Sequence, residues 1–354
     1  MLNNLFKNGV SIYEDEADKL NQIGCGYDIV GDYETAVEFW ENAAQAGNAE
    51  AMYQLGNAFM NGKGVPKDRV EAFDWYKSAA TGGNANAMYA VGCFYDNGIA
   101  VPKDFRQAFQ WKQKAADNGH TRAMRDIGNY YIDVLNDEPQ AFLWMKKAAE
   151  NGHIQAMSDL SIFYEKGMGV QQNYQEAFKW RKKAAENGYD FAMYALAWLY
   201  EDGNGVPQDY QEAFKWYYKS SEKGYTQAMY RIALLYEEGK GVPQDYQEAL
   251  KWYLKAADNG YAAAMYNIAW LYENGKGVRQ DYDKAFDWYL KAADNGYASA
   301  MNTLGYYFHN GIGSVSVNYN HAKHWYEKAV AANPDNETYR NNLNSLLRDM
   351  RRLF

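Results

Sequence analysis

Residues 228–263 read AMYRIALLYEEGKGVPQDYQEALKWYLKAADNGYAA, and variants of this stretch fill most of the chain. The dipeptide Ala-Met that opens it recurs at positions 51, 87, 123, 156, 192, 228, 264 and 300. The spacing is 36 residues except between 123 and 156, where it is 33. A degenerate unit precedes them, with Ile23 and Gly24 aligned to Leu55 and Gly56. The chain is therefore a tandem array of nine units.

Each unit contains two segments with helical periodicity. In the first segment of 228–263, apolar residues share one face at a period of 3.6, namely Ala228, Met229, Ile232, Ala233 and Tyr236. In the second segment the corresponding residues are Ala249, Leu250, Trp252, Tyr253, Ala256 and Ala257. The link between them, EGKGVPQD, contains Gly and Pro, which interrupt helices. The unit is predicted to be a helix-turn-helix.

Capping signals mark where the second helix begins. Asp245 stands at the expected N-cap and Glu248 follows three residues later, as in a capping box. Asp209 with Glu212, and Asp68 with Glu71, repeat the arrangement.

One such hairpin cannot bury its apolar face alone, whereas stacked neighbours can. We expect an all-α fold, a right-handed α-solenoid of about nine helix-turn-helix repeats with a C-terminal capping helix. The expected boundaries are an N-terminal cap segment, 1–18; repeats at 19–50, 51–86, 87–122, 123–155, 156–191, 192–227, 228–263, 264–299 and 300–335; and a capping helix, 336–354. In that last helix Tyr339, Leu343, Leu347 and Met350 share a face.

The repeated pattern AMYxLGxxYxxGxGVPxDxxxAxxWYxKAA resembles the Sel-one-like repeat (SLR), a relative of the tetratricopeptide repeat. The resemblance extends over about 90% of the chain, while the unit at 123–155 departs from it by reading DVLNDEP in place of the GxGVP link. It implies a protein-binding superhelix, often bacterial. Members of the family serve as adaptors, regulators, host-interaction factors and toxin-neutralising immunity proteins.

Composition excludes several other classes of protein. The net charge of −9, with no extended basic stripe, disfavours nucleic-acid binding. The chain has no apolar run long enough for a membrane span, and its N-terminus lacks the features of a signal peptide, so a cytoplasmic location is expected. Its two cysteines, Cys25 and Cys93, lie two repeats apart, too far for a disulfide, and are expected to be free thiols.

Tryptophan positions separate structural sites from candidate functional ones. Nine of the eleven tryptophans align at one second-helix position, which indicates packing: Trp40, Trp75, Trp111, Trp144, Trp180, Trp216, Trp252, Trp288 and Trp325. The remaining two, Trp198 and Trp270, lie in the first helix at a position where the unit between them has Leu234. The fold does not require tryptophan there.

These two tryptophans belong to a face opposite the expected core. If the first alanine of a unit is position 0, positions 0, 1, 4, 5 and 8 are expected to be buried, while positions 2, 6 and 9 point away from them. The tetratricopeptide analogy places this second face in a concave groove. The candidate partner-binding residues on it are Tyr53, Tyr89, Tyr194, Tyr230 and Tyr266 at position 2; Trp198, Leu234, Trp270 and Tyr306 at position 6; and Glu201, Glu237 and Glu273 at position 9. An aromatic and acidic surface is typical of an interaction patch.

Two other interpretations of this face stay open. A tightly wound solenoid could bury position 6 against the next unit. The stacked glutamates could instead form a hydrolase site, although equivalent copies provide no asymmetry between acid and base. His321 and His324 are spaced for a shared metal but have no third ligand in view. No cofactor motif is recognised, and the sequence leaves the oligomeric state undetermined.

The sequence therefore predicts a non-catalytic scaffold that binds a protein or peptide with a basic and apolar surface. An adaptor and an immunity or inhibitor protein that masks a toxin are the favoured roles. A secreted or surface host-interaction factor is the alternative.

Overall fold

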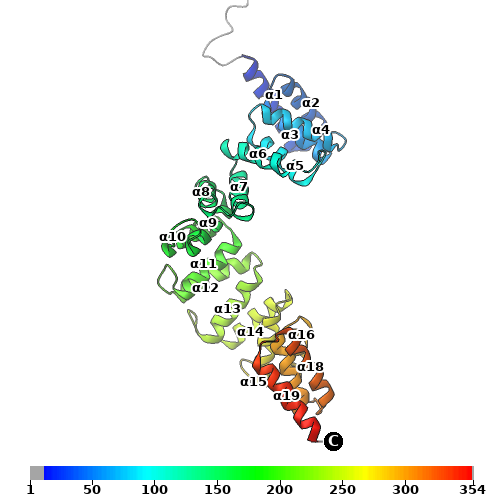
Figure 1. The fold of residues 1–354 in the computed structure, drawn as a ribbon, viewed down its shortest axis with the longest axis vertical. Coiled ribbons are helices and arrows are strands. Elements are labelled where there is room, and N and C mark those ends of the chain that lie inside the picture. The colour runs from blue at the N-terminus through cyan, green and yellow to red at the C-terminus, as the bar shows by residue number, and fades with distance from the viewer. Residues whose placement is uncertain (1–11, 353–354) are drawn as a thin grey trace, which may run out of the picture. The chain divides into compact units, whose positions relative to one another are not determined.

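A computed structural model describes residues 12–352 of the chain, with side chains from residue 16 onwards. This part of the chain forms nineteen α-helices and no strand (Figure 1). The helices are α1 (Ile12–Val30), α2 (Tyr33–Gln45), α3 (Ala49–Asn61), α4 (Arg69–Thr81), α5 (Ala85–Asn97), α6 (Phe105–Asp117), α7 (Thr121–Asp133), α8 (Glu138–Glu150), α9 (Ile154–Lys166), α10 (Tyr174–Glu186), α11 (Asp190–Asp202), α12 (Tyr210–Glu222), α13 (Thr226–Glu238), α14 (Tyr246–Asp258), α15 (Ala262–Asn274), α16 (Tyr282–Asp294), α17 (Ala298–Asn310), α18 (Tyr319–Ala332) and α19 (Glu337–Arg352).

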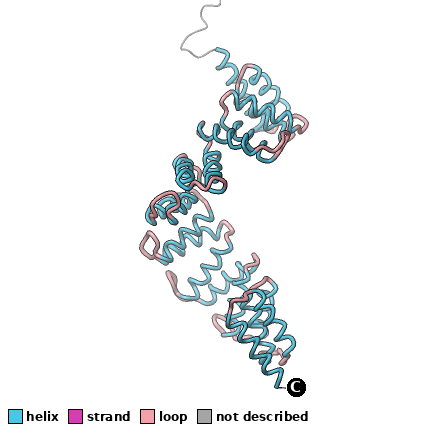
Figure 2. The backbone as a smooth tube through the Cα atoms, in the orientation of Figure 1, coloured by secondary structure: helices cyan, strands magenta, loops and turns pink. Residues whose placement is uncertain are grey.

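The helices follow one another as nine pairs joined by loops, followed by α19 (Figure 2). The predicted all-α solenoid with a C-terminal helix is confirmed. Two compact units divide the chain: unit 1 ends at Asn173 and unit 2 begins at Tyr174. This division falls between α9 and α10, inside the expected repeat 156–191. Helix α1 crosses the expected boundary between residues 18 and 19, and residues 1–11 of the expected cap lie outside the described residues.

The capping signals act as predicted, with one difference. Asp245 Oδ1 accepts hydrogen bonds from the backbone N–H groups of Gln247 and Glu248, which fixes the start of α14. The reciprocal capping-box bond is not formed, because the Asp245 N–H donates to the carbonyl of Tyr236, at 2.9 Å. The Glu248 side chain pairs instead with Lys251, at 2.5 Å.

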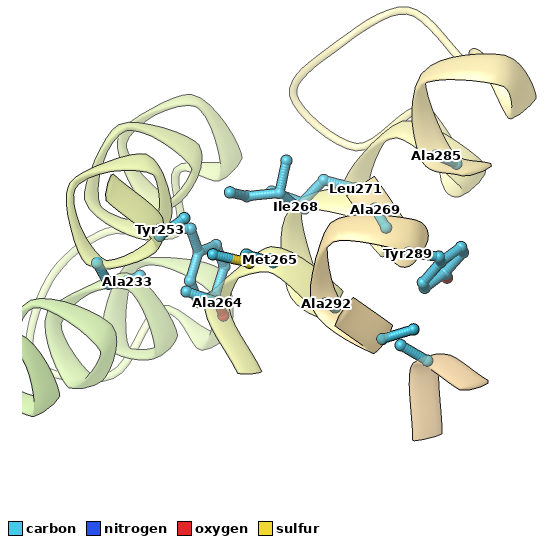
Figure 3. Close-up of a cluster of buried hydrophobic side chains, with 14 of the residues drawn as sticks. Ala233, Tyr253, Ala264, Met265, Ile268, Ala269, Leu271, Ala285, Tyr289 and Ala292 are labelled. Carbon is cyan, nitrogen blue, oxygen red and sulfur yellow. The ribbon is translucent and has the colours of Figure 1, made fainter. Parts of the chain in front are cut away.

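Small residues allow the two helices of a repeat to pack closely. In the repeat of α15 and α16, Ala264 and Ala269 of α15 and Ala285, Ala292 and Ala293 of α16 are buried. Ile268 and Leu271 of α15 lie with them in the core (Figure 3). At Gly56, an added Cβ would lie 2.5 Å from the Tyr76 ring, so a larger residue would separate α3 from α4. The expected buried set needs one correction: position 7, such as Leu235, is fully buried, whereas Tyr236 at position 8 is half-buried.

The second-helix core column consists mainly of tyrosine. Tyr217, Tyr253, Tyr289 and Tyr326, each one residue after the repeated tryptophan, are among the largest fully buried side chains. The predicted ninefold tryptophan column is wrong at one place, because Trp40 lies three residues before its alanine pair and so belongs to the tyrosine column. Its 5% exposure and its contact with Gly24 match that position.

The remaining eight tryptophans of the second helices form a separate column, and most of them are half-buried at the edge of the core. In each second helix from α6 to α18, a lysine three residues after the tryptophan lies over its ring. The Lys255 ammonium, for example, is 3.7 Å from the Trp252 ring centroid.

Helix α19 covers the last repeat. Leu346 is fully buried against Ala322 and Tyr326, with Leu343 and Met350 beside it. The sequence analysis assigned Leu347 to this face, but the buried residue is its neighbour Leu346.

Candidate functional site

The apolar residues at position 6 lie on successive first helices of unit 2. Trp198 comes from α11, Leu234 from α13, Trp270 from α15 and Tyr306 from α17. We call these four residues the aromatic row. The first three are half-buried, and Leu234 and Trp270 pack against the core cluster, whereas Tyr306 is 51% exposed. The row is thus part core and part surface.

The position-2 tyrosines form a ladder with tyrosines of the second helices and turns. The Tyr230 ring centroid lies 5.7 Å from that of Tyr253 and 5.0 Å from that of Tyr261. Tyr194 and Tyr266 make the equivalent pairs. Burial raises the pKa of Tyr230 to about 12, so its hydroxyl is neutral at physiological pH.

The glutamates at position 9 accept hydrogen bonds from tyrosines of their own repeats, and Glu201 also forms an ion pair with Arg231 of the next repeat, at 3.5 Å. Tyr217 Oη donates to Glu201 at 2.6 Å, and Tyr289 Oη donates to Glu273 at 2.7 Å. Glu273 also accepts a hydrogen bond of 3.0 Å from Tyr307 Oη. Phenol groups thus hold these carboxylates in place.

Sequence reasoning missed that these two positions are in contact, and in two repeats of unit 1 both of them are replaced. Where the glutamate is replaced by Asp96, the tyrosine is replaced by Lys112, and the two form an ion pair. In the next repeat the same positions hold Ile132 and Met145, which are both apolar. A comparison of residues sixteen positions apart, or thirteen in the repeat with the shortened link, could have revealed the contact.

Two predicted site residues belong to unit 1 and have different surroundings. The Tyr53 ring lies 5.7 Å from that of Tyr76. Tyr89 stacks on His120 with ring centroids 4.4 Å apart, and its Oη donates to Asp126 at 3.1 Å. They repeat the ladder position without the position-6 tryptophan, since Asn57 and Cys93 occupy that place in their two repeats.

Other chemistry has little support in the described region. No three His, Cys, Asp or Glu side chains in residues 16–352 are grouped as a metal site requires. Cys25 and Cys93 are free thiols. None of the described helices has the length and apolar character needed to cross a membrane.

The Sel1-repeat family model matches nine segments: 24–48, 49–84, 85–120, 122–153, 154–189, 190–225, 226–261, 262–297 and 298–334. The segments agree with the expected number of repeats. The first begins at residue 24 rather than 19, and each of the others begins one or two residues before the expected boundary.

Two solved structures combine this fold with sequence similarity. A protective antigen of uropathogenic Escherichia coli with an SLR fold is 31% identical, with a TM-score of 0.79, over 88% of this chain and 67% of its own. A Sel1 repeat protein from Oxalobacter formigenes is 32% identical, with a TM-score of 0.61, over 81% and 88% of the two chains. An immunity protein from Pseudomonas aeruginosa is 21% identical, with a TM-score of 0.40, over 58% and 81%. None of the curated proteins matches the chain.

Proposed function

The chain belongs to the Sel1-repeat family, and we propose that it is a non-catalytic scaffold that binds a protein partner through the first-helix face of unit 2. The observation that carries this proposal is the aromatic row. Four successive first helices present a large apolar side chain at one position, and the helical packing rule does not require tryptophan there. Tryptophan and tyrosine are enriched among residues that dominate binding energy.

The partner is a protein or peptide with apolar and basic groups. The chain has a net charge of −9, and Glu201, Glu237 and Glu273 lie on the same helices as the row. Complementary charge would mainly accelerate association, and contact with the row would slow dissociation.

Two roles fit such a scaffold, those of an adaptor and of an inhibitor that masks a basic toxin. An adaptor and an inhibitor bind different kinds of partner. Affinity capture from native cells followed by mass spectrometry would identify the partner of this chain. An inhibitor must abolish the activity of its partner at equimolar ratio, whereas an adaptor leaves that activity intact and joins the partner to a further protein.

A host-facing role is the second candidate function, because the relative with 31% identity and a TM-score of 0.79 is a protective antigen. Fractionation of native cells distinguishes the two locations. Recovery in the cytoplasm supports the adaptor or inhibitor, and recovery in the medium or at the cell surface supports the host-facing role.

Substitution of the row tests the binding face. The double variant Trp198→Ala/Trp270→Ala should bind the captured partner at least about 30-fold more weakly, which corresponds to about 2 kcal/mol. Trp252→Ala is the matched control, because Trp252 is also a half-buried tryptophan of unit 2 but lies on the second helix. The folded control should retain full affinity, and if the folded double variant also retains it, the proposed face is wrong.

A further inference from the structure

The fourth repeat lacks part of the link that every neighbouring repeat has. Helix α13 is joined to α14 by seven residues, Gly239 to Asp245, whereas α7 is joined to α8 by only four, Val134 to Asp137. Asn136 has a φ of 51°, like the glycines at its place in other links. When link 134–137 is aligned with link 239–245 from both ends, Val-Pro-Gln at 242–244 has no counterpart in the shorter link.

In two of the intact repeats the link valine packs against the core. Val65 packs against the buried cluster that contains Val37 of α2 and Leu55 and Ala58 of α3. It thus covers the junction between the second helix of one repeat and the first helix of the next. Val315 packs against the core of unit 2 in the same way.

In the fourth repeat a cavity of 380 Å³ lies at this junction. Its apolar lining includes Phe109, Ile127 and Tyr130, which align with Val37, Leu55 and Ala58 around Val65. The volume lies within the range of about 300–1,000 Å³ that is usual for ligand pockets. The cavity is therefore the place of the missing link valine.

Exposure shows that no side chain within residues 16–352 takes the place of the missing residues. The position-7 residue is buried in the seven other repeats that begin with Ala-Met: Ala58, Phe94, Phe163, Leu199, Leu235, Leu271 and Tyr307. Its equivalent Tyr130 is half-buried. Phe105 and Val134 at the mouth of the cavity are 62% and 56% exposed.

We propose that this cavity binds an extended segment of a protein partner, in which an apolar residue followed by proline takes the place of the missing Val-Pro. The site goes beyond the proposed function, because it lies in unit 1 and includes no residue of the aromatic row. The chain's own links show which peptide fits, since they fill the corresponding place in other repeats.

The charge of the cavity indicates which charged residue the partner segment should carry. Asp96 and Asp126 line the cavity and share one lysine, Lys112, so the site retains excess negative charge. The place of the link lysine of an intact repeat, such as Lys63, is taken here by Leu135, so this charge is not neutralised by the chain's own link. A lysine or arginine near the apolar residue of the partner segment is therefore expected.

The probe is the capped heptapeptide GKGVPQD, the sequence of residues 239–245, titrated into the full-length chain. Binding is expected, and replacement of its valine by alanine should weaken it about tenfold, as the loss of two buried methyl groups predicts. The decisive variant carries Val-Pro-Gln inserted between Asn136 and Asp137. It should refill the cavity, lose peptide binding at least tenfold and unfold at a higher temperature than the parent chain.

Each remaining outcome has a defined meaning. Absence of peptide binding, or equal binding by the parent and inserted variants, overturns the proposal. If the insertion prevents folding, Val134→Asp replaces it, because a charge at this exposed position should block binding without disturbing the core. Self-association that the insertion abolishes would identify a second copy of the chain as the occupant instead. Unchanged peptide binding by Trp198→Ala/Trp270→Ala keeps this test separate from that of the proposed function.

Discussion

Tyr253 Oη donates a hydrogen bond of 2.5 Å to Glu237 Oε2, although the two residues lie on different helices and sixteen positions apart. Tyr253 is fully buried, so its hydroxyl needs a partner within the protein. Asn267 of the next repeat donates to the same hydroxyl, at 2.9 Å. One tyrosine thus joins the two helices of its repeat and the first helix of the next.

The environment of Glu237 predicts a dependence of stability on pH. Burial raises the pKa of this carboxyl above its ordinary value, although the bond from Tyr253 opposes the shift. The folded state therefore holds the proton more tightly than the unfolded state, and the contribution of Glu237 to the free energy of unfolding should fall as pH rises from 4.5 through its folded pKa. Glu237→Gln should abolish this contribution. Denaturant unfolding of both proteins across this range checks it, and identical pH profiles would contradict it.

Two adjacent residues of α16 should differ sharply in their effect on folding. Tyr289 is fully buried, whereas Trp288 is half-buried with the Lys291 ammonium 4.0 Å from its ring centroid. Tyr289→Ala should lower the free energy of unfolding by about 3–5 kcal/mol, as other large aromatic truncations in cores do, and Trp288→Ala by less than half as much. Chemical denaturation measures both. A larger loss for the tryptophan would reverse the assignment of the core column.

Two glycines of α1 provide a matched pair for helix packing. An added Cβ at Gly24 would lie 2.7 Å from the Trp40 ring, while at Gly26 it would meet nothing within 4 Å. Gly26→Ala should stabilise the protein by roughly 0.5–1 kcal/mol through helix propensity. Gly24→Ala should destabilise it, because the indole must move. Equal shifts in melting temperature would mean that α1 and α2 do not pack at Gly24.

Salt should weaken partner binding if the acidic face recruits a basic partner. Replacement of Glu201, Glu237 and Glu273 by glutamine removes their charge but keeps an oxygen that can accept from each tyrosine. The association rate should fall and become less sensitive to ionic strength. Stopped-flow mixing with the captured partner at low and physiological salt measures this. A rate that does not depend on salt in the parent chain would exclude electrostatic recruitment.

Local signals predicted the elements of the fold well. Asp245 caps α14, and the link with its Gly and Pro residues separates α13 from α14 as predicted. Periodicity was less reliable in choosing between neighbouring positions. It selected Tyr236 over Leu235 and Leu347 over Leu346, because successive residues lie only 100° apart and a repeat with neighbours on both sides buries more than one stripe.

The candidate site was harder to predict, because its side chains interact with one another. The sequence places Glu237 on the face opposite the core, but it cannot show that Tyr253 reaches across from the next helix to bind it. The roles of Trp198 and Trp270 in partner binding stay predictions. Their half-buried state fits both a binding face and packing between repeats, and the substitutions described above separate the two.

The links also bear on how the array can lengthen during evolution. The second glycine of each complete link in unit 2 lies against the start of the preceding second helix, where an added Cβ at Gly241 would be 2.4 Å from the Tyr210 carbonyl carbon. Each 36-residue block from Ala192 to residue 299 thus contains the link glycine that packs against the block before it. An in-frame tandem duplication of one block inserts both halves of this joint at once, so the gene can gain a repeat in one step without any compensating substitution.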